Sequence, residues 1–121
     1  MADGIPRREY DLEERTFRFA QSVRAFVRQL PRTLSNIEDV KQLVRASGSV
    51  GANYIEANES LGKKDFVMRV KISRKEVKEC RYFLRLLNVD AQADVERTRS
   101  ALVLEATELM NIFGAIVRKC E

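Results

Sequence analysis

KKDFVMRVKISRKEVKECRYFLRLL, residues 63–87, decides the fold that this sequence predicts. Wound as an α-helix at about 100° per residue, the stretch divides its side chains among three faces instead of two. One face is a continuous stripe typical of a helix in a bundle core, and it consists of Phe66, Val70, Ser73, Val77, Cys80, Leu84 and Leu87. We therefore expect a helix that runs to about Asn88 and packs against other helices.

A second apolar stripe lies roughly 120° around this helix, and its members are Met68, Ile72, Phe83 and Leu86. A helix on the outside of a four-helix monomer needs one apolar stripe, so a second is left in water unless another chain covers it. We infer self-association through these four residues. Phe17 supports assembly, because it also falls off the core line of its own helix. The alternative is that the helix touches two partner helices within its own bundle, which would cover both stripes.

The remaining arc of the helix is basic and contains Lys64, Lys71, Arg74, Lys75, Lys78, Arg81 and Arg85. From residue 63 to 85, nine Lys or Arg stand against three acidic residues, so the net charge of this segment exceeds the +4 of the whole chain. Such a row suits the phosphates of RNA or DNA. The alternative is a solvated face that balances acidic residues elsewhere in the fold or in a neighbouring subunit. The chain has no aromatic RNP run, GXXG loop or helix-turn-helix signature, so binding would be salt-sensitive and weakly selective for sequence.

Two helices are predicted before this one. After a polar leader, residues 1–10, Asp11 is the expected N-cap of a helix that ends before Pro31. Ser35 and Glu38 have the spacing of a capping box, which indicates the start of a second helix.

The second helix contains SGSVGAN, residues 47–53, which is poor helix sequence because each Gly costs roughly 1 kcal/mol relative to Ala. Close approach of a neighbouring helix at Gly48, Gly51 and Ala52 would explain these small residues. The alternative is a break in the helix at this point.

The second helix is expected to end near Asn58, with Gly62 in or after the turn that follows. Asp90 is the expected cap of a fourth helix, which runs to Cys120. Four amphipathic helices with short links pack most simply as an antiparallel up-down-up-down bundle, and 121 residues have room for one such domain, residues 1–121.

Several classes of site are disfavoured by composition. The chain has no histidine, which removes the usual general base and the usual zinc ligand. Cys80 and Cys120 match no metal spacing and fall on apolar faces, so we expect buried free thiols. No apolar run approaches the roughly 18–20 residues that span a membrane, and the N-terminus is not a secretory signal. These features predict a cytoplasmic protein that is not an enzyme and holds no cofactor or metal.

A resemblance to a known family is carried by DLEERTFRFAQSVRAFVRQLP (11–31), KQLVRASGSVGANYIEANESLGKKDFVMRVKISRKEVKECRYFLRLL (41–87) and ELMNIFGAIVRK (108–119). The chain resembles the bacterial four-helix-bundle family encoded in intervening sequences of 23S ribosomal RNA genes. The most specific part is SVGANYIEANES followed by KKDF and KISRKEVKEC. A related branch comprises the accessory variability determinants of retroelements, which are basic barrels that bind nucleic acid.

The resemblance implies a left-handed up-down bundle assembled as a homopentameric ring, with no enzymatic chemistry attached to it. Asn53 and Glu56 match family positions, and both lie off the core stripe of the second helix. We expect them to form interhelix or intersubunit hydrogen bonds that set the register of packing.

The whole sequence thus predicts an all-α, non-enzymatic, homo-oligomeric bundle, with a pentamer as the expected assembly. It would bind RNA or DNA through the basic arc. The alternative function is a protein-interaction scaffold with a protein partner and no nucleic-acid role. Salt titration separates the two, because phosphate contacts weaken steeply as salt rises.

Overall fold

The computed structural model describes residues 7–121, and it describes side chains from residue 12 onward. This part of the chain forms four α-helices and no strand. The helices are α1 (Arg7–Val27), α2 (Leu34–Asn58), α3 (Lys63–Leu86) and α4 (Ala93–Lys119). The protein is therefore all-α, as the sequence predicts.

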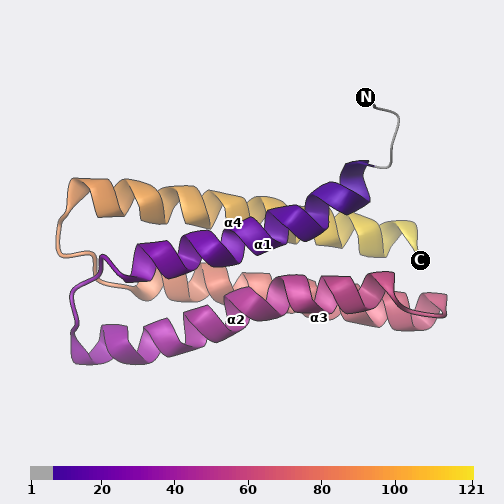
Figure 1. The fold of residues 1–121 in the computed structure, drawn as a ribbon, viewed down its shortest axis with the longest axis horizontal. Helices are drawn as coiled ribbons and strands as arrows, with labels where there is room; N and C mark the ends of the chain where they lie inside the picture. Colours follow the sequence, from indigo (N-terminus) through magenta and orange to yellow (C-terminus); the bar gives the residue numbers. More distant parts are fainter. Residues whose placement is uncertain (1–6) are drawn as a thin grey trace.

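The four helices run up and down along one another (Figure 1). Contacts join α1 to α2, α2 to α3, α3 to α4 and α4 back to α1, which is the neighbour pattern of a four-helix bundle. The start of α1, the α2–α3 turn and the end of α4 lie at one end of the bundle, which we call the terminal end. The α1–α2 and α3–α4 connections lie at the opposite end, the loop end.

The core lies between the helices and receives side chains from all four. Its fully buried members include Val23 and Phe26 of α1, Leu43 and Val50 of α2, Val70, Val77, Cys80 and Leu84 of α3, and Leu109 and Phe113 of α4. Several polar groups that enter the core form hydrogen bonds to nearby main-chain atoms. Ser73 Oγ, for example, donates to the main-chain oxygen of Val50 at 2.8 Å and so links α3 to α2. Apolar burial and satisfied polar groups together hold α2 and α3 in one register.

A buried amide joins the two connections at the loop end. Asn36 is 2% exposed, and its Nδ2 donates to the main-chain oxygens of Pro31 and Asn88, both at 2.9 Å. Its Oδ1 accepts from the main-chain N–H of Asn88 at 3.0 Å. Because these partners belong to two different connections, Asn36 fixes the spacing between the start of α2 and the end of α3.

The glycine-containing part of α2 is an unbroken helix, so the alternative of a break is wrong, and the predicted close approach of a neighbouring helix is found at Gly51. A Cβ on Gly51 would lie 2.8 Å from Thr16 Oγ1 and 3.2 Å from Thr16 Cβ. These distances are shorter than a van der Waals contact allows, so only glycine lets α1 come this near. Thr16 itself is held in place, because its hydroxyl donates to the main-chain oxygens of Leu12 and Glu13.

The three helix caps predicted from sequence are wrong by a few residues. The helix α1 begins at Arg7 instead of after Asp11, since no Gly or Pro interrupts the good helix formers before it. Residues 7–10 of the predicted leader are therefore helical, and residues 1–6 lie outside the described residues.

The second cap is Thr33, whose side chain accepts from the N–H of Asn36 at 3.1 Å, and Ser35 lies within the first turn of α2. This earlier start places Asn36 where it can reach both connections. Gln92, rather than Asp90, precedes α4. Asp90 and Ala91 instead form the tight turn before it, with positive φ angles of 59° and 57°.

The helix α4 is long and apolar enough to cross a membrane, with a mean hydropathy of 1.5 over its most apolar window. This differs from the prediction that no apolar run approaches the length of a membrane span. The core helix of a bundle can pass the same test. Two acidic residues of α4 contact α1, because Arg15 donates to Glu105 at 2.7 and 2.9 Å and to Glu108 at 2.7 Å. These hydrogen bonds raise the pKa of Arg15 further above its ordinary value. Within the bundle 33% of that window is buried, and the hydrogen bonds of Arg15 to Glu105 and Glu108 join α4 to α1.

Candidate nucleic-acid interface

The basic arc lies on the solvent side of α3. Its members Lys64, Lys71, Arg74, Lys75, Lys78 and Arg85 are exposed, and Arg81 is half-buried. Arg81 Nη1 donates to Thr107 Oγ1 on α4 at 3.3 Å, so this side chain lies along the α3–α4 boundary. Six of the seven predicted cations are therefore accessible to a ligand, and the seventh is partly engaged within the bundle.

Charged residues on the α2 side of α3 form ion pairs, whereas most of those in the basic arc do not. Toward α2, Arg45 Nη2 donates to Glu79 Oε1 at 3.0 Å and lies 3.4 Å from Glu76 Oε1. Within the basic arc, Lys75 lies 3.9 Å from Glu76, and the other six cations form no ion pair with residues 12–121. Glu76 and Glu79 thus pair with a cation of α2, and the basic arc is left largely uncompensated.

The fold extends the basic arc onto α4. The side chains of Arg118 of α4 and Arg74 of α3 both pass close to Gly114. A Cβ on Gly114 would be 3.4 Å from Arg118 Nη1 and 3.7 Å from Arg74 Nε. Arg118 is exposed and therefore adds to the same cationic surface. Arg118 is not among the cations predicted from sequence, because a helical wheel of one helix cannot show what an adjacent helix contributes.

The second apolar stripe does not form one continuous surface. Met68 and Leu86, at its two ends, are each 51% exposed. Ile72 and Phe83, in its middle, are half-buried, and Phe83 packs against the core. The middle of the stripe turns toward α2, as the contact of Arg45 with neighbouring Glu79 shows, so the bundle itself covers part of it.

Asn53 and Glu56 have different surroundings. Asn53 Oδ1 accepts from Arg69 Nη1 at 3.1 Å, and its Nδ2 donates to the main-chain oxygen of Ser49 at 3.0 Å. Asn53 therefore joins α2 to α3. Glu56 is exposed, and its carboxylate makes no hydrogen bond to the side chains that the structure describes.

A buried carboxylate lies between α2 and α3. Glu76 is 7% exposed, and its Oε1 accepts no hydrogen bond from the described residues, although it lies 3.4 Å from Arg45 Nη2. Among residues 12–121, no group of three or more potential ligands could hold a metal ion. The Arg45–Glu76–Glu79 cluster is an internal ion-pair network that links α2 to α3.

The two cysteines are free thiols in unlike positions. Cys80 is fully buried, and burial raises the pKa of its thiol to about 12. Cys120 is only partly buried, so the expectation that both thiols are buried is wrong for this one. It follows the last turn of α4 at the terminal end, where fewer helices cover it.

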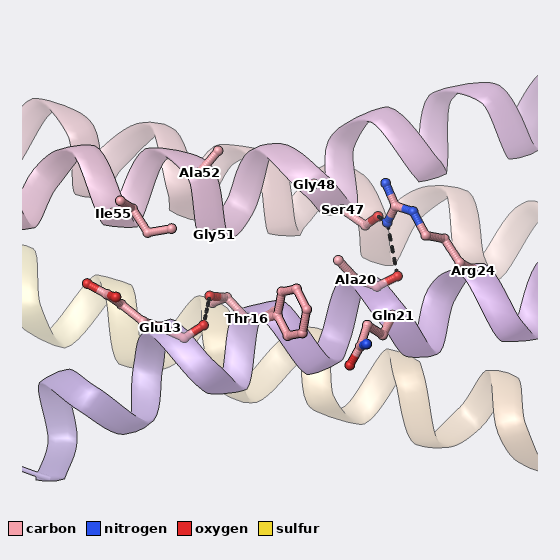
Figure 2. A pocket seen from close by; sticks show the side chains of 11 residues that line it. Glu13, Thr16, Ala20, Gln21, Arg24, Ser47, Gly48, Gly51, Ala52 and Ile55 are labelled. Atoms are coloured by element: carbon pink, nitrogen blue, oxygen red, sulfur yellow. Dashed lines mark hydrogen bonds between the residues drawn. The ribbon is translucent and has the colours of Figure 1, made fainter.

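A groove of about 380 Å³ lies between α1 and α2. Its lining includes four small residues that Figure 2 labels, Gly48, Gly51 and Ala52 of α2 and Ala20 of α1. At one end Arg24 Nη1 donates to the main-chain oxygen of Ala20 at 3.0 Å and to Ser47 Oγ at 3.4 Å. The groove exists because the small residues let the two helices come close without filling the space above them.

Comparison with known proteins agrees with this architecture. A solved structure from Bacteroides thetaiotaomicron VPI-5482, described as a protein with unknown function from the S23 ribosomal protein family, superposes with a TM-score of 0.75. It is 24% identical over 88% of this chain and 97% of its own, so the likeness concerns the fold. None of the curated proteins matches the chain. The family model for the 23S rRNA-intervening sequence protein matches residues 8–114. The chain therefore belongs to the 23S rRNA-intervening sequence protein family.

Proposed function

We propose that this protein is a non-enzymatic, cytoplasmic homo-oligomer, a pentamer, that binds RNA or DNA through the basic arc of α3. The observation that carries the proposal is the lack of compensation: six of the seven cations of the arc form no ion pair with residues 12–121, while Glu76 and Glu79 of α3 contact Arg45 of α2. A solvated face that merely balanced the fold's own acidic residues would have those residues beside it.

Exposed Lys and Arg bind phosphates chiefly by releasing condensed counterions, which makes affinity depend strongly on salt. With about four phosphate contacts on a single strand, the slope of log K against log salt is expected to be about −3. An oligomer would repeat the arc once per subunit and so increase the apparent affinity for a long strand. The arc offers no groove-reading element, so different sequences should bind about equally well.

The test compares two variants of equal net charge. In the first, Lys71, Arg74, Lys78 and Arg85 are changed to Glu; Arg81 is left in place because it donates to Thr107. In the control, four exposed cations outside the arc are changed to Glu: Arg28, Arg32, Lys41 and Arg97. Binding to a labelled 20-nucleotide RNA and a DNA of the same sequence is followed by fluorescence anisotropy between 50 and 300 mM salt.

We expect the arc variant to lose binding, while the control keeps most of its affinity and a steep salt slope. Equal losses in both variants would mean that net charge alone attracts the strand, and retained affinity in the arc variant would remove this face from consideration.

A protein-interaction scaffold is the second candidate function. It is favoured by exposed apolar side chains outside the basic arc, such as Leu34, Tyr82 and Leu104, which are 89%, 58% and 60% exposed. A wild-type protein that ignores both nucleic acids at 50 mM salt would favour this function.

A further inference from the structure

We propose that the subunits join head to tail, with the Met68 region of α3 on one copy seated in the α1–α2 groove of the next copy. This inference rests on the homo-oligomeric part of the proposed function and adds which two surfaces meet.

The groove is an apolar hollow that an apolar side chain could enter. Gly51 and Ala52 belong to its lining, and so do Phe17 of α1 and Ile55 of α2, which are 58% and 47% exposed. Large apolar side chains that remain half in water on both sides of a groove favour a partner that covers them.

The opposite surface carries the matching side chain. Met68 of α3 is 51% exposed, and it borders a second hollow with the half-buried Val67. Methionine is unbranched and adaptable, which suits insertion between two other side chains. Lys64 lies one turn before Met68 on the same exposed side of α3.

The two surfaces lie at the same height in the bundle. The bonds from Arg69 to Asn53 and from Ser73 to Val50 set the register of α3 against α2. The two helices are antiparallel and have the same rise per residue, so each step toward the end of α2 corresponds to one step toward the start of α3. Ile55 is therefore about level with Met68. A rotation about an axis parallel to the bundle leaves heights unchanged, so Met68 of one copy reaches Ile55 of the next without sliding.

Charge complementarity supports the same pairing. Glu56 and Glu59 are exposed on α2 beside Ile55, and they are about level with Lys64 in the register set above. A neighbour's Lys64 would therefore meet carboxylates when its Met68 enters the groove. This contact would supply the exposed Glu56 with a partner that residues 12–121 of its own subunit do not provide.

The alternative two-fold arrangement, with α3 against α3, is disfavoured by charge. It would bring the uncompensated basic arcs of two copies together, which costs free energy. A head-to-tail contact uses two different surfaces, and repeated rotation closes it into a ring. Lys64 would then belong to the subunit contact, and the remaining cations of the arc would stay free for nucleic acid.

The decisive experiment mixes two variants that each lack one surface. Met68→Asp removes the inserted side chain and leaves the groove intact, whereas Ile55→Asp spoils the groove and leaves Met68 intact. Both positions are about half exposed, so the fold should persist, as circular dichroism would verify. Tyr82→Asp, at an exposed apolar residue elsewhere on α3, is the matched control.

We expect each variant alone to have the 13.9 kDa mass of one chain by light scattering, and the control to keep the wild-type mass. An equimolar mixture of the two variants should form a dimer of twice that mass and stop there, because one intact contact remains per pair. Variants that keep the wild-type mass, or a mixture that stays at 13.9 kDa, would overturn the head-to-tail contact. A monomeric wild type would instead overturn the oligomeric part of the proposed function.

A charge exchange gives a second readout. Lys64→Glu and Glu59→Lys should each raise the concentration at which the assembly dissociates by about tenfold, since like charges then face each other. The double variant should return to within about threefold of wild type. Absence of this recovery would contradict the pairing of Lys64 with the α2 carboxylates.

Discussion

Two glycines one turn apart on α2, Gly48 and Gly51, predict opposite effects of the same alanine substitution. A Cβ on Gly48 would have Arg24 Nη2 as its nearest neighbour at 3.6 Å, the mobile end of a long side chain. A Cβ on Gly51 would lie 2.8 Å from Thr16 Oγ1 and 3.2 Å from Thr16 Cβ. Thr16 cannot simply rotate away, because it is β-branched and its hydroxyl bonds to the preceding turn of α1.

The magnitudes follow from two terms. Alanine in place of glycine inside a helix stabilises by about 0.5–1 kcal/mol. Gly48→Ala should gain this amount. Overpacking a close helix contact costs typically 1–3 kcal/mol, so Gly51→Ala should lose a net 0.5–2 kcal/mol, roughly. For a chain of this size, a 1 kcal/mol change moves the melting temperature by about 3–5 °C.

Urea unfolding followed by circular dichroism would measure both variants at one protein concentration, with light scattering to show whether the assembly has changed. We expect Gly48→Ala to unfold at higher urea than wild type and Gly51→Ala at lower urea. Adding Thr16→Ala to Gly51→Ala should recover part of the loss, because it removes the hydroxyl at 2.8 Å. If both single variants were stabilised, the close approach of α1 and α2 at Gly51 would be refuted.

Three further predictions concern the loop end and the thiols. Asn36→Ala should destabilise the fold by about 2–4 kcal/mol in the same urea assay, since it removes three part-buried hydrogen bonds to the main chain of two connections. A loss below roughly 0.5 kcal/mol would contradict this role of Asn36. Ala91→Gly should gain about 0.5–1 kcal/mol, because φ of 57° costs alanine more than it costs glycine; a lower melting temperature would count against this. At pH 8 a thiol reagent should label Cys120 in the folded protein and label Cys80 only after unfolding. Burial raises the pKa of Cys80 from 9.0 to about 12 in the folded protein. The stability that comes from the protonated thiol should therefore be present below pH 9 and be lost as pH rises toward 12. A Cys80→Ala variant should lack that part of the pH dependence.

Much of the architecture follows from local patterns. Four amphipathic periodicities separated by short polar joints identify the helices, since an apolar stripe at helical spacing leaves few ways to pack. The basic arc could likewise be read from α3, because the positions on one helix fix which side chains share a face. The caps were less predictable. Thr33 and Ser35 are both residues that favour the N-cap position. The helix starts after Thr33, and this start is compatible with the hydrogen bonds of Asn36 to both connections.

By itself, the sequence determined the helix count, the order of the helices and the three-faced character of α3. Tertiary structure alone decided which of these faces matter. It turned Ile72 and Phe83 toward α2 while leaving Met68 in water, and it brought Arg118 of α4 beside the basic arc. The register of α3 against α2 also set the height of Met68 relative to Ile55. Helical periodicity is a property of neighbouring residues in the chain, whereas burial, register and shared surfaces depend on contacts between helices, which no single stretch of sequence contains.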